Sequence, residues 1–129
     1  MLVTVSVLEN VKLKAGCRSH EIVTDQPRDE GGSDAGMTPL ELLGASLASC
    51  IAYYVVKYCH RHQISASKLK VDLDWTFAEN PHRVGVFDVK IRLPQPLSDR
   101  DRRVLIKIAQ SCTVHNTLSH TPTINMSLE

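Results

Sequence analysis

Hydrophobic and polar positions alternate along the first two dozen residues of the chain. The hydrophobic members of this pattern are Val3, Val5, Val7, Val11 and Leu13. A period of two, carried by β-branched residues, indicates strands whose successive side chains point to opposite faces. We therefore predict three short strands joined as a meander, with turns at residues 9–10 and 15–16 and the third strand over residues 20–24.

A long loop and a long helix are predicted next. Residues 25–37, DQPRDEGGSDAGM, are dense in Asp, Gly and Pro and predict the loop. Thr38, Pro39 and Glu41 then form a helix start, with Thr as N-cap, Pro at the first helical position and Glu completing a capping box. The helix should run to about His62. Because its middle is apolar on every side, we expect it to be buried all round and to need a second subunit for that.

The second half of the chain predicts a hairpin, a helix and a final strand. Hydrophobic and polar residues alternate over 68–78 and 83–93, which favours an antiparallel hairpin with one wet face. Ser98 is a good N-cap for an amphipathic helix that ends near Cys112. Residues 114–118, VHNTL, suit one more helical turn, and residues 123–128 alternate as a last strand.

Composition limits the class of protein. The chain has 129 residues, enough for one domain over residues 1–129, with 43% hydrophobic and 22% charged residues and a formal net charge of +1. This balance predicts no nucleic-acid or membrane partner. The longest uncharged run, residues 42–56, is shorter than the roughly 20 residues of a membrane helix. No signal segment is evident, so we expect a cytoplasmic protein.

The four cysteines are the first candidates for chemistry. They are Cys17, Cys50, Cys59 and Cys112, and no CxxC pair occurs among them. Cys50 lies in the apolar helix, where a cysteine is most often a packing residue, and a reactive thiol there would need a nearby cation or hydrogen-bond donors. Cys112 lies at a helix break. If a short helix begins there, its N-terminus would favour the thiolate, whereas the alternative is an ordinary helix-end cysteine.

Other polar residues have simpler interpretations. Cys59, His60 and His62 offer three metal ligands within four residues, but neighbouring helix positions face different ways. We therefore favour the interpretation that these three residues form the polar end of the helix. We expect the protein to bind no metal and no cofactor. Arg18 and Arg28 lie in predicted turns or loops, where solvated arginines are common.

Two segments resemble the OsmC/Ohr family of osmotically induced and organic-hydroperoxide-resistance proteins. Residues 31–50, GGSDAGMTPLELLGASLASC, resemble the family's glycine loop, Pro-initiated central helix and first cysteine. Residues 111–124, SCTVHNTLSHTPTI, are similar to its second-cysteine segment. The resemblance implies an α+β, OsmC-like fold in which antiparallel sheets wrap around long central helices in an intertwined homodimer.

The resemblance also implies an activity. It is that of a thiol-dependent peroxidase that reduces organic hydroperoxides, with hydrogen peroxide as a further candidate substrate, in oxidative-stress defence. Cys50 would become a sulfenic acid, and Cys112 would condense with it to a disulfide. An external dithiol, of lipoyl or thioredoxin type, would reduce that disulfide.

The family pattern also points to helper residues. An arginine stabilises the reactive thiolate in such proteins, and the candidates here are Arg28, which is preferred, and Arg18. The partner of this arginine is a glutamate directly after the helix-starting proline. Here that position is Leu40, and Glu41 is one residue, or about 100° around the helix, further on. The apolar approach to Cys50 would consist of Leu43, Leu47, Ile51 and Tyr54.

A second hypothesis belongs to another functional class. It is a non-catalytic OsmC-like dimer that binds a small apolar or thiol-reactive ligand in the same pocket. The displaced glutamate motivates it. A Cys50 thiol that titrates at or above the free-cysteine value of about 8.5 would favour this hypothesis over the peroxidase.

Overall fold

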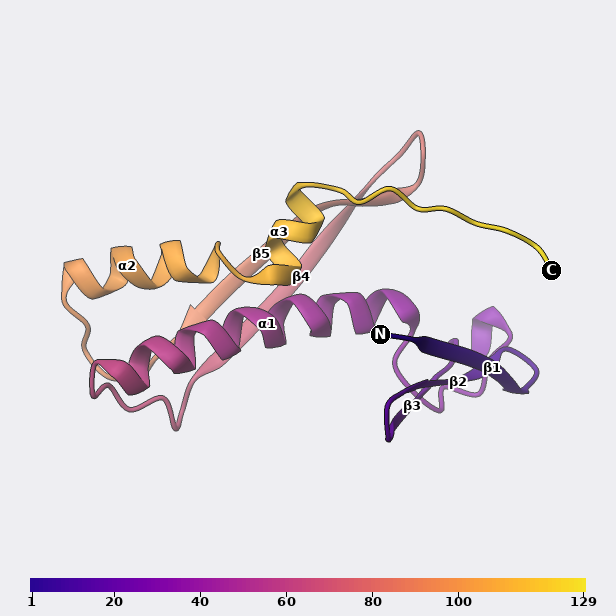
Figure 1. Ribbon diagram of the computed structural model, residues 1–129, viewed down its shortest axis with the longest axis horizontal. Coiled ribbons are helices and arrows are strands. Elements are labelled where there is room, and N and C mark those ends of the chain that lie inside the picture. Colours follow the sequence, from indigo (N-terminus) through magenta and orange to yellow (C-terminus); the bar gives the residue numbers. More distant parts are fainter. The chain divides into compact units, whose positions relative to one another are not determined.

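The fold is of the α+β class, with antiparallel sheets and three α-helices, as the sequence predicts. The computed structural model describes residues 1–129, which form two compact units, residues 1–44 and residues 45–129. The elements in chain order are β1 (Val3–Glu9), β2 (Lys12–Cys17), β3 (His20–Thr24), the 3₁₀ helix η1 (Arg28–Glu30), α1 (Pro39–Arg61), β4 (Lys70–Ala78), β5 (Arg83–Arg92), α2 (Asp99–Ala109) and α3 (Thr113–Ser119) (Figure 1).

The first unit contains the predicted meander, with strand order β1-β2-β3. The first turn lies at residues 10–11, one position later than predicted, and the second lies at residues 18–19 and not at residues 15–16. Ala15 is instead paired with Val5 on one side and with Ile22 on the other. Arg18 takes the strained turn position, with φ of 55°. The prediction was wrong because Gly16 was taken as a turn residue, whereas in the structure it is part of β2 and pairs with Thr4.

The loop after β3 is organised around one carboxylate. Asp25 is 1% exposed, and its oxygens accept the backbone N–H groups of Gln26, Ser33 and Ala35 at 2.8, 3.0 and 3.1 Å. Gly36 lies so close to β3 that a Cβ atom would stand 2.4 Å from a backbone oxygen. The long loop is therefore a fixed structure, because a buried charge must be fully hydrogen-bonded.

Helix α1 begins with the predicted capping box. The N–H of Thr38 donates to Glu41 Oε2 at 2.8 Å, and the N–H of Glu41 donates to Thr38 Oγ1 at 3.2 Å. The helix extends beyond the uncharged run at both ends. By length and composition alone it could cross a membrane, a test that the core helices of soluble proteins also pass.

One face of α1 forms the core of the second unit. The buried residues Leu47, Ile51, Val55 and Cys59 recur every fourth position, which places them on one stripe of the helix. Within the single chain the other faces are open: Tyr53, for example, is 57% exposed. Burial on every side with the help of a second subunit stays a prediction. Within one chain there is not enough other structure to cover the remaining faces.

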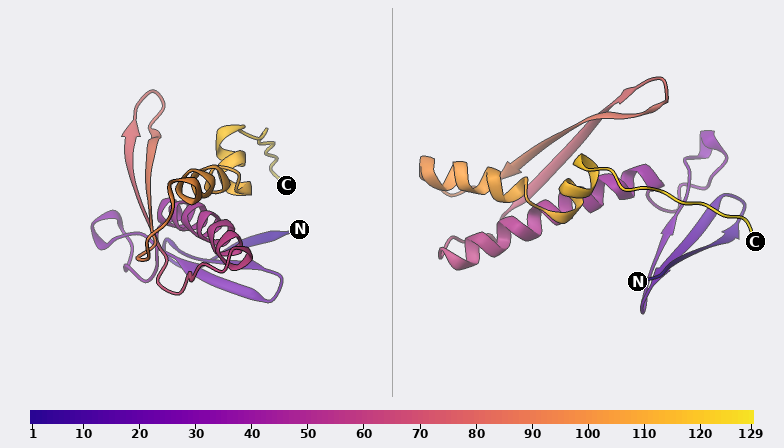
Figure 2. Two further views of the ribbon diagram at one scale, coloured as in Figure 1. Left: turned by 90° about the vertical axis from the view of Figure 1, so that its left-hand side faces the viewer. Right: turned by 45° about the horizontal axis from the view of Figure 1, so that its top comes forward.

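The β4–β5 hairpin and α2 complete this core. Trp75 pairs with Phe87 in the antiparallel register, and the hairpin's alternate residues pack against the buried stripe of α1. Helix α2 begins after Ser98, whose hydroxyl accepts the N–H of Asp101, as predicted. Its buried residues include Leu105. Helices α1 and α2 lie on the same side of the hairpin (Figure 2).

The predicted last strand is absent. Residues 120–129 have no helix or strand, and the hydrophobic residues of the segment, Ile124, Met126 and Leu128, are 76%, 90% and 100% exposed. The alternating pattern suits a strand, but a strand needs a neighbour for its backbone hydrogen bonds. Neither sheet offers one to this segment.

Candidate active site

The second unit brings the thiols of Cys50 and Cys112 together. Cys50 lies near the middle of α1, and Cys112 is the N-cap of α3, a few residues after α2 ends. Both are free thiols, and they interact as neighbouring groups. Cys112 is completely buried, whereas Cys50 is only partly buried. The two residues are 62 positions apart in sequence, so only the packing of α3 near α1 makes them neighbours.

The predicted short helix does begin at Cys112, but it does not produce a thiolate. Burial raises the pKa of the Cys112 thiol, the N–H of His115 lowers it, and the neighbouring Cys50 thiol raises it again. The net direction is upward, because a buried thiolate loses its hydration. The N-cap hydrogen bond is nevertheless present, because the N–H of His115 donates to Sγ of Cys112 at 3.3 Å. Cys112 is therefore a protonated thiol at neutral pH.

Tyr54 joins α1 to the beginning of α3. Its hydroxyl lies 3.2 Å from Oγ1 of Thr113, the residue that follows Cys112. The sequence predicted Tyr54 as part of an apolar approach to Cys50, and the structure adds a polar contact at its ring end. This hydrogen bond helps to hold the Cys112 segment against the helix that carries Cys50.

The predicted helper residues belong to the other unit. Arg28 begins η1, Arg18 occupies the turn between β2 and β3, and the Glu41 carboxylate is engaged in the capping box. Leu43, which was predicted for the apolar approach, also belongs to residues 1–44 and is 37% exposed. The roles of these residues at Cys50 stay predictions.

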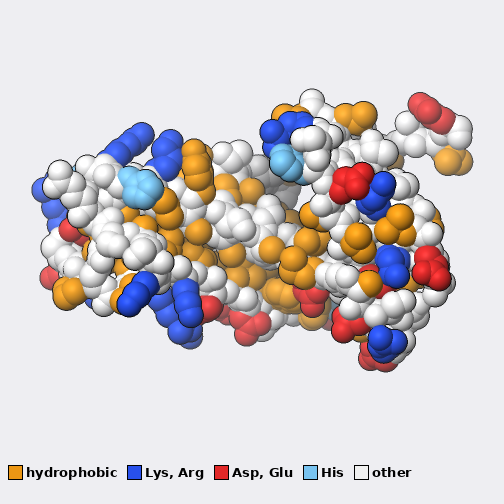
Figure 3. Space-filling model, turned by 90° about the horizontal axis from the view of Figure 1, so that it is seen from below, with side chains coloured by type: hydrophobic (Ala, Val, Ile, Leu, Met, Phe, Trp, Pro, Cys, Tyr) orange, Lys and Arg blue, Asp and Glu red, His pale blue; other side chains and the backbone are white.

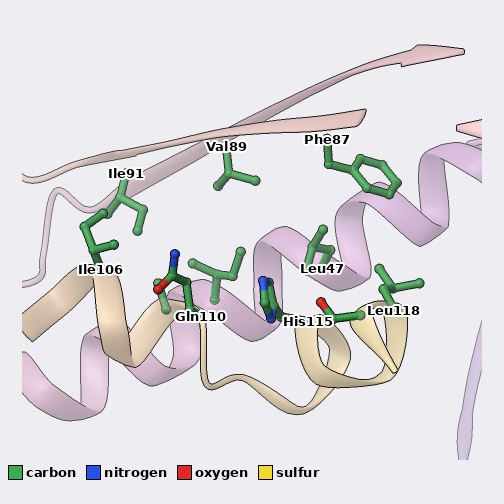
Figure 4. A pocket seen from close by; sticks show the side chains of 11 residues that line it. Leu47, Phe87, Val89, Ile91, Ile106, Gln110, His115 and Leu118 are labelled. Carbon is green, nitrogen blue, oxygen red and sulfur yellow. The ribbon is translucent and has the colours of Figure 1, made fainter. Parts of the chain in front are cut away.

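A cavity of about 380 Å³ opens in the second unit. Its apolar walls include Leu47 and Ile51 from α1, Phe87 and Val89 from β5, Ile106 from α2 and Leu118 from α3. Leu47 and Ile51 are two of the four residues predicted for the apolar approach, and they flank Cys50 in sequence. Phe87 and Val89 reach into the cavity from β5, opposite Gln110 and His115 (Figure 4).

The sequence reasoning missed His115 as a site residue. Its ring lines the cavity, and its buried Nδ1 has no hydrogen-bond partner. The available signal was its position, three residues after Cys112, where an N-cap side chain meets a backbone N–H. That signal identifies the backbone contact, but the orientation of the ring depends on α1 and β5, which are distant in sequence.

The cysteine and histidines at the end of α1 do not form a metal centre. Cys59 is completely buried in the core, while His60 and His62 are exposed. Burial raises the pKa of the Cys59 thiol, and the charge of Asp101 raises it further. No group of three His, Cys, Asp or Glu side chains is arranged to hold a metal ion. His62 instead stacks on Tyr58, with ring centroids 4.1 Å apart.

The fold is similar to that of several solved proteins. A protein from Psychrobacter arcticus, named for osmotic stress induction and a detoxification response, shares 25% identity with a TM-score of 0.81, over 89% of this chain and 85% of that one. An OsmC-like protein from Mycoplasma pneumoniae shares 21%, with a TM-score of 0.77 over 92% and 86% of the two chains. An organic hydroperoxide resistance protein OsmC from Legionella pneumophila shares 16%, with a TM-score of 0.60 over 91% and 87%.

The sequence itself also matches a family. A search of curated proteins finds no match. The family model described as OsmC-like protein, however, matches residues 31–127, which include both cysteines of the pair and every wall of the cavity. This agrees with the resemblance carried by the two cysteine segments and with the fold of the solved proteins. The chain therefore belongs to the OsmC-like family.

Proposed function

We propose that this chain is a thiol-dependent peroxidase that reduces organic hydroperoxides in oxidative-stress defence. The single observation that carries the proposal is the proximity of the Cys50 and Cys112 thiols within one chain. Membership of the OsmC-like family supports it, as does the similarity in fold to a Legionella protein named for organic hydroperoxide resistance. Hydrogen peroxide is a further candidate substrate.

The chemistry proceeds in three steps. The Cys50 thiolate attacks the terminal oxygen of the hydroperoxide, so that an S–O bond forms, the O–O bond breaks and the alcohol leaves after taking up a proton. Cys112 then attacks the sulfur of the Cys50 sulfenic acid, which forms the disulfide and releases water. An external dithiol, of lipoyl or thioredoxin type, reduces the disulfide and is itself oxidised.

The different environments of the two thiols support these roles. A peroxide must reach the attacking sulfur, and Cys50 is the more accessible of the two. Cys112 is completely buried, and its raised pKa keeps it protonated until a sulfenic acid forms beside it. A resolving thiol that is protonated and shielded does not compete for the peroxide. The order of attack thus follows from exposure.

The helper residues belong to this proposal as well. Arg28, or else Arg18, stabilises the Cys50 thiolate, because a neighbouring cation favours the charged form of a thiol. Leu47 and Ile51 supply the apolar approach together with Leu43 and Tyr54. Glu41 holds its capping-box contacts, and its part in catalysis is to orient the arginine.

A homodimer, located in the cytoplasm, is part of the same proposal. Only 22% of the most apolar stretch of α1 is buried within the chain. Val3, Val5 and Val7 on β1 are 60%, 54% and 68% exposed. Hydrophobic side chains lie open at the surface of the molecule (Figure 3). Exposed apolar area on this scale is typical of a surface that another subunit covers.

Substitution of single cysteines tests the peroxidase. With a reducing dithiol supplied, Cys50→Ser should lower cumene hydroperoxide consumption to the background rate, and Cys112→Ser should leave a sulfenic acid that dimedone traps. Cys17→Ser is the matched control, because Cys17 lies at the end of β2 in the other unit. Unchanged turnover by the Cys50 variant would refute the proposal.

One observation favours the second candidate, a non-catalytic dimer that binds a small apolar or thiol-reactive ligand. Oε2 of the Glu41 carboxylate already accepts the N–H of Thr38 in the capping box, so the start of the helix competes with an arginine for this carboxylate. Titration of the Cys50 thiol by its rate of alkylation against pH distinguishes the two functions. A midpoint at or above about 8.5 supports the binding protein.

A further inference from the structure

One hydrogen bond links the segment that carries Cys112 to helix α1. The Tyr54 hydroxyl and Oγ1 of Thr113 lie 3.2 Å apart. Thr113 is the first residue of α3 and directly follows Cys112, while Tyr54 lies four positions after Cys50 on α1. Residues at this spacing share one face of a helix. The bond therefore joins the neighbours of the two thiols, at the point where α3 lies beside α1 (Figure 1).

Other hydrogen bonds of the Cys112 segment are local. The hydroxyl of Ser111 donates to the carbonyl of Lys107 at 2.8 Å, and the hydroxyl of Thr117 donates to the carbonyl of Thr113 at 2.8 Å. Such bonds fix the segment along its own chain but do not set its distance from α1. Apolar packing also holds the segment, but it has no preferred direction. The hydrogen bond to Tyr54 is therefore the directional contact between α1 and α3.

The sulfur of Cys112 must change its contacts before it can form a disulfide. In the reduced protein its Sγ accepts the N–H of His115 at 3.3 Å and caps α3. When this sulfur attacks the Cys50 sulfenic acid, its lone pair turns away from that N–H. Helix α3 then loses its N-cap, and a helix without its N-cap is less stable. The bond between Thr113 and Tyr54 holds the start of α3 in place during this step.

We propose that Thr113 and Tyr54 are positioning residues for disulfide formation and that they limit the overoxidation of Cys50. The inference rests on the proposed function, which supplies the sulfenic acid. Cys112 attacks the sulfur of that acid, so that an S–S bond forms, the S–O bond breaks and hydroxide leaves as water with the thiol proton. Holding Cys112 close to its target raises the effective concentration of the attacking thiol and so the rate of this step.

A second hydroperoxide competes with Cys112 for the sulfenic acid. The Cys50 sulfur attacks the terminal oxygen of this second molecule, so that an S–O bond forms, the O–O bond breaks and a second alcohol leaves. The product is a sulfinic acid, which an external dithiol does not reduce. Cys50 is only partly buried, so the second hydroperoxide can reach it as the first did. Faster disulfide formation therefore lowers the fraction of turnovers that end in the sulfinic acid.

Substitution of Thr113 tests this competition. Thr113→Val keeps the shape of the side chain and removes its hydroxyl. The rate of disulfide formation should fall about two- to tenfold, the range that one hydrogen bond supplies. The concentration of cumene hydroperoxide that gives a fixed fraction of Cys50 sulfinic acid, measured by mass spectrometry, should fall by the same factor. A merely structural role would slow sulfenic acid formation as well, whereas positioning slows only the second step.

Further variants assign the effect to this hydrogen bond. Thr113→Ser retains the hydroxyl and should behave as the original protein does. Tyr54→Phe removes the other half of the bond, and its combination with Thr113→Val should slow disulfide formation no more than either change alone. Thr117→Val is the matched control, because the Thr117 hydroxyl bonds within α3. An equal effect in Thr117→Val would overturn the proposal, since the stability of α3 would then set the rate.

A reaction without peroxide separates this inference from the proposed function. In the Cys17→Ser protein, dithiodipyridine converts Cys50 to a mixed disulfide and releases one thiopyridone. The Cys112 thiol then attacks the Cys50 sulfur, forms the disulfide and releases a second thiopyridone. Cys59 does not take part, because it is completely buried and burial raises the pKa of its thiol. The rate of the second release should fall about two- to tenfold in Thr113→Val.

The two reactions together decide each proposal separately. A slower second release in Thr113→Val, in a protein that does not reduce cumene hydroperoxide, would support the positioning role and refute the peroxidase. An unchanged second release in Thr113→Val, or in Tyr54→Phe if the first variant does not fold, would refute the positioning role even where peroxide turnover is observed. Absence of a second release from the unmodified Thr113 protein would also overturn the positioning role.

Discussion

The backbone N–H of His115 donates a hydrogen bond of 3.3 Å to the sulfur of Cys112, while the ring of the same residue lines the apolar cavity. One residue therefore contacts the buried thiol through its backbone and the cavity lined by Leu47 and Ile51 through its side chain.

The first prediction concerns the order in which the cysteines react. In native reduced protein at neutral pH, iodoacetamide should modify Cys50 at least roughly tenfold faster than Cys112, because Cys112 is buried and its raised pKa keeps it protonated. Mass spectrometry of proteolytic peptides over time measures both rates. In urea the two rates should become similar, and equal rates in the native protein would contradict the buried, protonated state of Cys112.

The second prediction concerns the carboxylate inside the loop. Burial raises the pKa of Asp25, but the hydrogen bonds from the N–H groups of Gln26, Ala35 and Ser33 together lower it by more, so the pKa lies below its usual value. The folded chain thus binds this proton less readily than the unfolded chain. The stabilisation is present above the unfolded value of about 3.9 and is lost as the pH falls through the folded value.

Asp25→Asn should therefore lower the midpoint of thermal unfolding at pH 7 by roughly 5 °C or more. The new amide group would face the N–H groups of Ser33 and Ala35, which now donate to Oδ2, and would leave them unpaired. Calorimetry from pH 7 to pH 2 measures the effect. The difference between the variant and the original protein should shrink below about pH 3.9, and a constant difference would contradict the lowered pKa.

The third prediction separates helix capping from catalysis. Thr38→Ala removes the N-cap hydroxyl and should lower the free energy of unfolding by about 1 kcal/mol. Glu41→Gln keeps the capping box, so its effect on stability should be below about 0.5 kcal/mol. Urea unfolding measures both values. If a stable Glu41→Gln variant loses cumene hydroperoxide turnover, the Glu41 carboxylate has a part in catalysis. If turnover is complete, the role of Glu41 is limited to capping the helix.

The fourth prediction concerns the second subunit. Sedimentation equilibrium of the reduced protein should give the mass of two chains. Tyr53 is 57% exposed on α1 in the single chain, and we expect the partner to cover it. Tyr53→Glu should then weaken dimerisation at least about tenfold, because an unpaired charge would be buried. His60→Glu is the control on the polar end of the helix, and a single-chain mass for the original protein would contradict the dimer.

Several features could be predicted from the sequence because they depend on neighbouring residues. The capping box formed by Thr38 and Glu41 is present as predicted, since an N-cap and the residue three positions later meet in any helix. The alternation over β4 and β5 predicted the hairpin for a similar local reason. The two cysteine segments also sufficed for the family.

Only the tertiary structure decided the properties that depend on distant residues. The position of Cys112 at a helix N-terminus could be predicted from the sequence. The burial of its thiol, which raises the pKa of that thiol, depends on packing among α1, α2 and α3. The same packing orients His115 toward the cavity. The segment over residues 123–128 shows the converse, because its pattern is that of a strand and yet no strand lies beside it. Local sequence determines backbone preference, whereas burial and pairing require partners that are distant along the chain.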